Sequence, residues 1–269
     1  MKELYKENYY NGSRIASVWY RLTKYIQPKE YYSSDFTPIE TINPSKDKKG
    51  IVSFTLFGDE KSDRFWSYLV EPLLTNSRQI SRILPGWGLR VYISSSLSSE
   101  VYDVLVDADY ELVVMNENPK YPFIGLLWRF LVANENLPFL VCDADMLLDD
   151  NSWLLTNLNQ VSDWLESDKT FFRRKNFPSN MLWPICAGGW GGRPTKDGRA
   201  AIPDIKDRLE KYNYNWFGSD ESFLYKEVWP LFKKETYYTS YSVAEKGFWI
   251  VSVLIIVGVL LFLILRKRT

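Results

Sequence analysis

Short apolar runs alternate with helix-like patterns along the middle of the chain, and this order limits the folds that it can adopt. Apolar runs of strand length occur at residues 51–57, 89–94, 111–115 and 139–142. Apolar residues with helical spacing lie between them, at residues 62–84, 99–106 and 123–134. Strands joined by helices pair in parallel, with helices on both faces of the sheet. We therefore predict an α/β fold with a Rossmann-like, mostly parallel sheet, and a possible helix break at Pro72.

Two aspartates, Asp143 and Asp145, follow the last of these apolar runs. Positions i and i+2 of an extended chain face the same way, so both carboxylates can meet at the carboxyl end of a strand, where open α/β sheets bind ligands. Carboxylate oxygens suit Mg²⁺ or Mn²⁺, with substrate phosphates and water completing the coordination shell. The motif predicts a metal that binds a diphosphate. The alternative is an acidic turn after a strand, since the motif is short and Asp is common in turns.

Composition excludes several classes of function. The chain has no histidine, which rules out histidine general acid/base catalysis, Ser-His-Asp triads and histidine metal sites. Lys and Arg together number 33, as do Asp and Glu, so nothing indicates a nucleic-acid partner. The two cysteines, Cys142 and Cys186, form no disulfide framework, which fits a reducing compartment.

The C-terminal end predicts a membrane anchor. Residues 247–265 carry no charge and would span about 28 Å as a helix, close to the thickness of a bilayer's hydrocarbon core. Phe248 and Trp249 lie at one edge of this segment, and the basic residues 266–268 lie at the other, as interfacial anchors do. Because no N-terminal signal peptide is evident, we expect a tail anchor with the main domain in the cytosol. The sequon at residues 11–13 favours the lumenal side, which stays open.

The expected organisation has five segments. A polar N-terminal segment with a short helix at 13–26 and a linker precedes the globular domain, and a linker, the membrane helix and a basic tail follow it. Their bounds are 1–49, 50–236, 237–246, 247–265 and 266–269.

The motifs of the globular domain, in their order, resemble a known family. They are Ser53-Phe54-Thr55-Leu56-Phe57-Gly58, Pro85-Gly86-Trp87, Trp128-Arg129-Phe130, Asp143-Ala144-Asp145, Ala187-Gly188-Gly189-Trp190-Gly191 and Ser219-Asp220-Glu221-Ser222-Phe223-Leu224. This order resembles the D-x-D glycosyltransferases of the GT-A fold over roughly residues 50–234. It is most similar to the glycogenin-like and galactosyltransferase-like group and to small glycosyltransferase-like proteins of large DNA viruses. The resemblance implies a metal-dependent enzyme that transfers a sugar from a nucleotide-sugar donor, by preference a UDP-sugar, to a glycan, glycolipid or glycoprotein acceptor.

The resemblance also implies roles on the donor side. Asp143 and Asp145 would bind Mn²⁺ or Mg²⁺. Arg129 would bind phosphate or donor-sugar oxygens; its alternative is a salt bridge to one of the aspartates. Phe57, Gly58 and Asp59 would contact the nucleobase and ribose, and the alternative is an ordinary strand-to-helix turn.

On the acceptor side, Gly188 and Gly189 would line the sugar site, and Trp190 would stack on the acceptor. A glycine-rich hairpin with a packed tryptophan is the alternative. Asp220 would orient the acceptor hydroxyl or act as base, or it would simply cap a helix.

The missing histidine is a departure from this pattern, because many relatives have a C-terminal histidine as a third metal ligand. Residues 237–241 offer only hydroxyl groups there. This leaves a second expectation open, a catalytically inactive membrane-anchored binding or structural protein with the same fold. An aspartate-nucleophile phosphatase fits poorly, since its motif follows the first strand and continues to Thr or Val.

Overall fold

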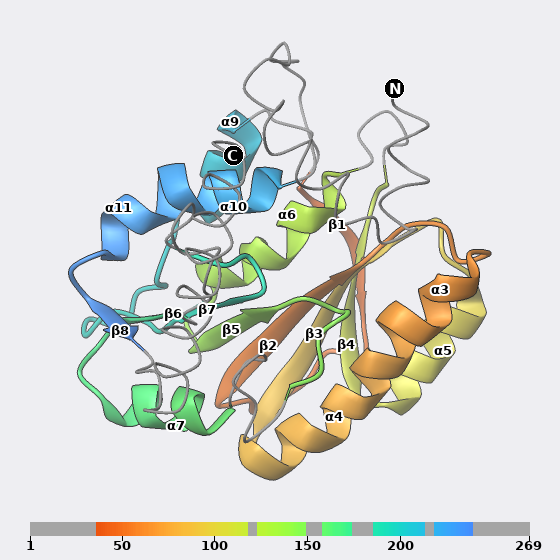
Figure 1. The fold of residues 1–269 in the computed structure, drawn as a ribbon, viewed down its shortest axis with the longest axis horizontal. Coiled ribbons are helices and arrows are strands. Elements are labelled where there is room, and N and C mark those ends of the chain that lie inside the picture. The colour runs from red at the N-terminus through yellow and green to blue at the C-terminus, as the bar shows by residue number, and fades with distance from the viewer. Residues whose placement is uncertain (1–35, 118–122, 149–157, 174–184, 213–217, 239–269) are drawn as a thin grey trace, which may run out of the picture.

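The computed structural model describes residues 36–117, 123–148, 158–173, 185–212 and 218–238. These residues form an eight-stranded sheet with helices on both faces (Figure 1), which confirms the predicted α/β class. The predicted N-terminal helix at 13–26 and the predicted membrane segment at 247–265 lie outside the described residues. Within the described residues, no helix is long and apolar enough to cross a membrane.

The sheet has the strand order β1-β4-β3-β2-β5-β7-β6-β8. Its strands are β1 (Pro38–Ile42), β2 (Gly50–Leu56), β3 (Trp87–Ser94), β4 (Tyr110–Met115), β5 (Phe139–Cys142), β6 (Phe171–Arg173), β7 (Gly189–Gly192) and β8 (Thr236–Tyr238). The central strands β4, β3, β2 and β5 are parallel, as predicted. The sheet is nevertheless mixed, because β1 pairs antiparallel with β4, and β7 pairs antiparallel with both β5 and β6.

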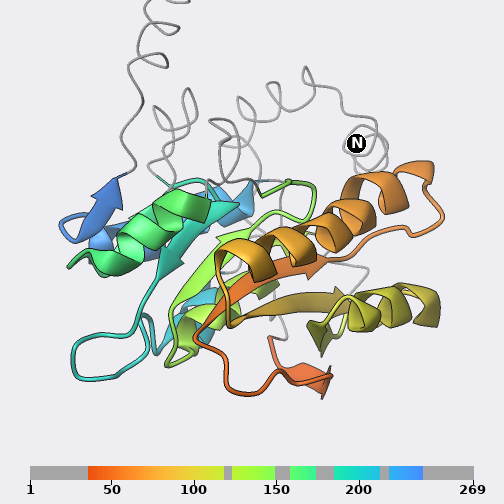
Figure 2. The ribbon, with the colours of Figure 1, turned by 90° about the horizontal axis from the view of Figure 1, so that it is seen from below.

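Helices cover both faces of the sheet. They are α3 (Asp63–Phe65), α4 (Glu71–Ile83), α5 (Ser99–Asp107), α6 (Gly125–Trp128), α7 (Leu158–Glu166), α9 (Ile205–Lys211), α10 (Ser219–Phe223) and α11 (Trp229–Phe232). Residues of α4, α5 and α7 share one apolar cluster, and residues of α6, α9 and α10 share the other. Figure 1 and, after a quarter turn, Figure 2 show α4 lying against the strands.

The strands divide their side chains between these two clusters. In β5, Phe139 and Val141 belong to the cluster with α6, whereas Leu140 and Cys142 belong to the cluster with α4. Successive strand residues point to opposite faces, and a sheet covered on both faces needs apolar residues on both. This explains the uninterrupted apolar runs in the sequence.

A π-helical turn, η1 (Trp66–Val70), stands where we expected a break at Pro72. The N–H of Glu71 donates to the carbonyl O of Trp66, five residues back, and Pro72 then sits in the first turn of α4. A second π turn, η3 (Leu224–Val228), precedes Pro230 in the same way. Proline lacks an N–H and clashes with the carbonyl four residues back, so a wider turn before it lets the helical chain continue.

The described sheet extends past both predicted ends of the globular domain. Before Gly50, β1 pairs with β4, and Phe36 is buried in the core at 1% exposure. At the other end, β8 reaches Tyr238 and pairs with β6. Residues 36–49 were predicted to belong to the linker because their composition is polar. The edge strand β1 lies within them, since an edge strand needs few apolar residues.

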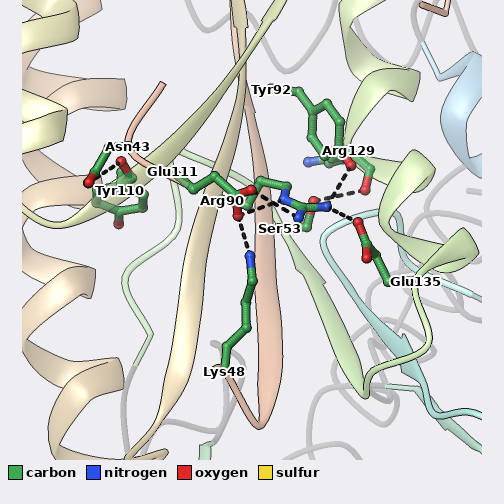
Figure 3. A network of polar contacts seen from close by, with 9 residues as sticks. All are labelled: Asn43, Lys48, Ser53, Arg90, Tyr92, Tyr110, Glu111, Arg129 and Glu135. Atoms are coloured by element: carbon green, nitrogen blue, oxygen red, sulfur yellow. Dashed lines mark hydrogen bonds and ion pairs between the residues drawn. The ribbon is translucent and has the colours of Figure 1, made fainter. Parts of the chain in front are cut away.

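A buried ionic network joins Lys48, in the connection between β1 and β2, to charged residues of the strands β3 and β4 (Figure 3). Arg90 donates from Nε and Nη2 to the two carboxylate oxygens of Glu111, at 3.1 Å each. Lys48 also pairs with Glu111, and Arg90 Nη1 donates to Glu135 at 2.6 Å. Arg90 and Glu111 are 7% and 5% exposed, so each charge depends on its partners.

Candidate active site

A pocket of about 440 Å³ opens at the carboxyl ends of β2 and β5. Its apolar lining comes from Phe57, Phe65, Tyr68, Leu69 and Leu126. Its charged lining comes from Asp143, Asp145, Asp220, Glu221, Arg64 and Arg129. The carboxylates outnumber the guanidinium groups, so the lining favours binding of a cation.

Asp143 and Asp145 both line this pocket, but not through strand geometry. β5 ends at Cys142, and the two aspartates lie in the turn that follows, where the N–H of Met146 donates to the carbonyl O of Asp143 at 3.3 Å. Alternation along a strand was therefore the wrong reason for their proximity. The turn brings both carboxyl groups to one pocket.

Arg129, at the start of the 3₁₀ segment η2 (Arg129–Asn134), lies between Asp143 and Asp220. It is 2% exposed; Nη1 pairs with Asp143, and Nη2 donates to Asp220 at 3.1 Å. Nη1 also donates to the carbonyl O of Cys142 at 3.1 Å. Burial disfavours the charge, but the two carboxylates outweigh it and raise the pKa of Arg129. This geometry agrees with the alternative that Arg129 forms a salt bridge to one of the two aspartates.

Asp220 lies inside the first turn of α10 and is not its cap. The N-cap is Gly218, whose φ of +85° lies in the left-handed region that glycine tolerates. Asp220 Oδ2 accepts from Arg129, and Oδ1 accepts the N–H of Glu221 at 3.0 Å. Both oxygens of Asp220 are thus engaged. Burial and then the adjacent Asp220 raise the pKa of Glu221 well above its ordinary value, so Glu221 can carry a proton in this pocket.

Gly188 contributes to the site by making room for Asp143. A Cβ atom on Gly188 would lie 1.8 Å from Asp143 Oδ2. Gly189 starts β7 opposite Cys142, which brings Gly188 close to the loop that carries Asp143 and Asp145. Trp190 is 0% exposed and packs against Phe139, with ring centroids 5.3 Å apart. The predicted stacking of Trp190 on an acceptor is therefore wrong, and the packed-tryptophan alternative holds.

Replacing Gly188 with alanine is expected to displace the Asp143 carboxylate and to weaken Mn²⁺ binding. Overpacking of this kind costs about 1–3 kcal/mol of stability. Gly191→Ala is the matched control, since its Cβ would meet the carbonyl O of Phe139 at 2.3 Å, away from the carboxylates. Both variants should lose stability in thermal melts, but only Gly188→Ala should lose Mn²⁺ affinity. Equal affinity in the two variants would contradict this role of Gly188.

Of the three residues predicted to contact the nucleotide, all in the loop after β2, only Phe57 lines the pocket. Phe57 lines the pocket, and its ring meets Trp128 edge-on at 6.1 Å. Gly58, with φ of +118°, turns the chain away from the strand. Asp59 is exposed, and its Oδ1 accepts the N–H of Lys61 at 3.1 Å. The structure brings Phe57 to the pocket, whereas Asp59 stabilises the turn.

An apolar part of the pocket lining and one carboxyl group had no predicted role. Phe65, Tyr68 and Leu69 reach the pocket from α3 and the π turn η1, and Glu221 follows Asp220. The proline in a helical pattern was the available signal, because it points to an irregular turn before Pro72. No periodicity marks Glu221.

The donor set fits a divalent cation that shares its shell with a substrate. Within the described residues, no cluster of three or more His, Cys, Asp or Glu side chains has metal-binding geometry. Asp143 and Asp145 would therefore supply two carboxylates, and phosphate oxygens and water would supply the rest, as is usual for Mg²⁺.

Asp145 is exposed as a residue, but partial desolvation of its carboxyl group and then the neighbouring Asp143 raise its pKa to about 6. A protonated carboxyl is a poor metal ligand, so Mn²⁺ affinity should be full above about pH 7 and fall about tenfold per pH unit below pH 6. Mn²⁺ titrations followed by electron paramagnetic resonance between about pH 5 and 8 measure this. Asp145→Asn should bind weakly, without that dependence. A flat affinity in the wild type would refute the prediction.

Comparisons with known proteins give no family. No family model matches the chain, and no curated protein matches it. Among solved structures, the glycosyltransferase GlyE of Streptococcus pneumoniae TIGR4 is similar, with 12% identity and a TM-score of 0.37. The match covers 72% of this chain but only 46% of GlyE, so this chain spans less than half of that protein.

Proposed function

We propose that this protein is a glycosyltransferase that uses a nucleotide-diphosphate sugar and a divalent metal held by Asp143 and Asp145. One observation carries the proposal: two carboxylates share a pocket with an apolar wall at the carboxyl ends of parallel strands. That is where open α/β sheets bind nucleotides. The pocket volume of about 440 Å³ falls within the range of small-molecule and cofactor sites.

The chain's own groups have distinct parts in this proposal. Phe57 and Tyr68 offer aromatic faces to a base, and Arg129 orients Asp143 from within the protein. Mn²⁺ or Mg²⁺, when bound, would neutralise the diphosphate and make it a better leaving group. Glu221 is the pocket carboxyl group able to hold a proton near the acceptor, while Asp220 anchors Arg129.

The acceptor in this proposal lies near a membrane. The apolar segment at 247–265 would anchor the chain in the bilayer, with the main domain on the cytosolic side. A glycan, a glycolipid or a glycoprotein close to the membrane surface would then be within reach. The UDP-sugar donor is taken from the family resemblance alone.

A second candidate is a membrane-anchored binding protein that holds a nucleotide sugar without turning it over. Two observations favour it. The chain has no histidine, and both oxygens of Asp220 are engaged by Arg129 and the backbone. Such a protein would bind the donor with metal and would not hydrolyse it.

Thermal melts of the full chain in detergent test the proposal. A ligand that binds only the native state stabilises it by RT ln(1 + [L]/Kd), about 2.7 kcal/mol at one hundred times Kd. We expect the melting temperature to rise with Mn²⁺ and one nucleoside diphosphate together, and less with either alone. Donor hydrolysis then separates the enzyme from the binding protein. No rise with any combination would refute both.

A further inference from the structure

Asn76 lies within α4 and is completely buried, at 0% exposure. A buried amide costs stability unless it is hydrogen-bonded, and this one bonds outside its own helix. Its Nδ2 donates to the carbonyl O of Met146 at 2.8 Å, and its Oδ1 accepts the N–H of Leu148 at 2.8 Å. One side chain thus satisfies two backbone groups of the loop after β5, about seventy residues away in sequence.

The two aspartates of this loop are held differently. Asp143 pairs with Arg129 and lies tightly against Gly188. Asp145 has no ion pair with any residue in the described part of the chain. Its position therefore depends on the loop backbone, and the anchored carbonyl belongs to Met146, the next residue.

Helix α4 also connects this anchor to the apolar part of the pocket lining. The π turn η1 leads directly into α4 and supplies Tyr68 and Leu69 to the apolar wall. Asn76 lies about two turns further along the same helical chain. The loop with Asp145 is thus bonded to the helix that continues from the π turn carrying Tyr68 and Leu69.

We propose that Asn76 is a positioning residue, which holds Asp145 in register with Asp143 for binding a divalent metal through its two bonds to the loop backbone. The inference rests on the proposed metal-dependent function and adds a residue that acts through Asp145. Residues behind metal ligands typically change affinity 10- to 100-fold when they are removed.

Mn²⁺ binding to the full chain in detergent, measured by electron paramagnetic resonance with Mn²⁺ alone, tests this role. Asn76→Leu keeps the number of side-chain heavy atoms and the branching at Cγ, and it deletes both bonds. Ile80→Ala is the matched control, because Ile80 is equally buried in α4 and its removal lowers stability while leaving both hydrogen bonds of Asn76 to the loop in place. We expect Asn76→Leu to bind Mn²⁺ about 10- to 100-fold more weakly, and Ile80→Ala to bind it as the wild type does.

Amide hydrogen exchange supplies a readout that needs no metal. The Leu148 amide should exchange faster in Asn76→Leu and stay protected in Ile80→Ala. If Asn76→Leu does not fold, Asn76→Ser, which leaves room for water, takes its place with the same expectations.

The outcomes separate this inference from the proposed function. Equal Mn²⁺ affinity in the wild type and the Asn76 variants would overturn the positioning role alone. Weaker affinity with unchanged Leu148 exchange would also overturn it, because the loop would not have been released. A wild-type protein that binds no Mn²⁺ would overturn both.

Discussion

Replacing Asp145 with alanine is expected to abolish metal-dependent hydrolysis of the nucleotide-sugar donor, with a rate at least about 100-fold below the wild type. The variant would retain one carboxylate ligand, and the charge that develops on the leaving diphosphate would lose its stabilisation. Asp145 is the cleaner position for this experiment, since Asp143 also pairs with the buried Arg129. Hydrolysis of a panel of UDP-sugars and other nucleotide sugars with saturating Mn²⁺ is the measurement.

Two further variants complete this experiment. Asp143→Ala should lose the same activity and also lose stability, because it leaves Arg129 with Asp220 as its one carboxylate partner among the described residues. Asp168→Ala is the control, as that side chain is 82% exposed and lies outside the pocket. Full activity in both Asp143→Ala and Asp145→Ala would sink the glycosyltransferase assignment.

Replacing Glu111 with leucine is expected to destabilise the protein by about 3–5 kcal/mol. Glu111 bonds Arg90 through both carboxylate oxygens and also pairs with Lys48, so its loss leaves two poorly solvated cations side by side (Figure 3). The mutation lies on the sheet, away from the pocket, so Mn²⁺ affinity should not change. Urea unfolding at neutral pH measures the stability.

The paired control is Glu135→Gln, which removes a charge from the same network at a side chain that is 38% exposed. We expect a loss of about 1 kcal/mol or less there, as for solvent-exposed ion pairs. The double variant Arg90→Met/Glu111→Leu should recover part of the loss, because it removes the buried charge together with its partner. A Glu111→Leu variant as stable as the wild type would refute the structural role of this network.

The sequence alone determined the α/β class and the place of Asp143 and Asp145 after a buried strand. Apolar strands and amphipathic helices follow from local periodicity, and that periodicity requires helices on both faces of a parallel sheet. An apolar strand that ends in Asp143-Ala144-Asp145 puts carboxylates at the sheet's ligand-binding edge, whether the aspartates belong to the strand or to the turn. The absence of histidine from the sequence likewise excluded histidine acid/base catalysis, Ser-His-Asp triads and histidine metal sites.

Only the tertiary structure decided what each side chain contacts. Periodicity shows which face of an element is apolar, but not which distant residue covers it or pairs with it. The partners of Arg129 lie 14 and 91 residues away, and those of Asn76 lie 70 and 72 residues away. The same limit explains Trp190, whose aromatic ring suits a core or a sugar equally well until its neighbours are known. Local patterns specify elements, whereas the pocket is made where those elements meet.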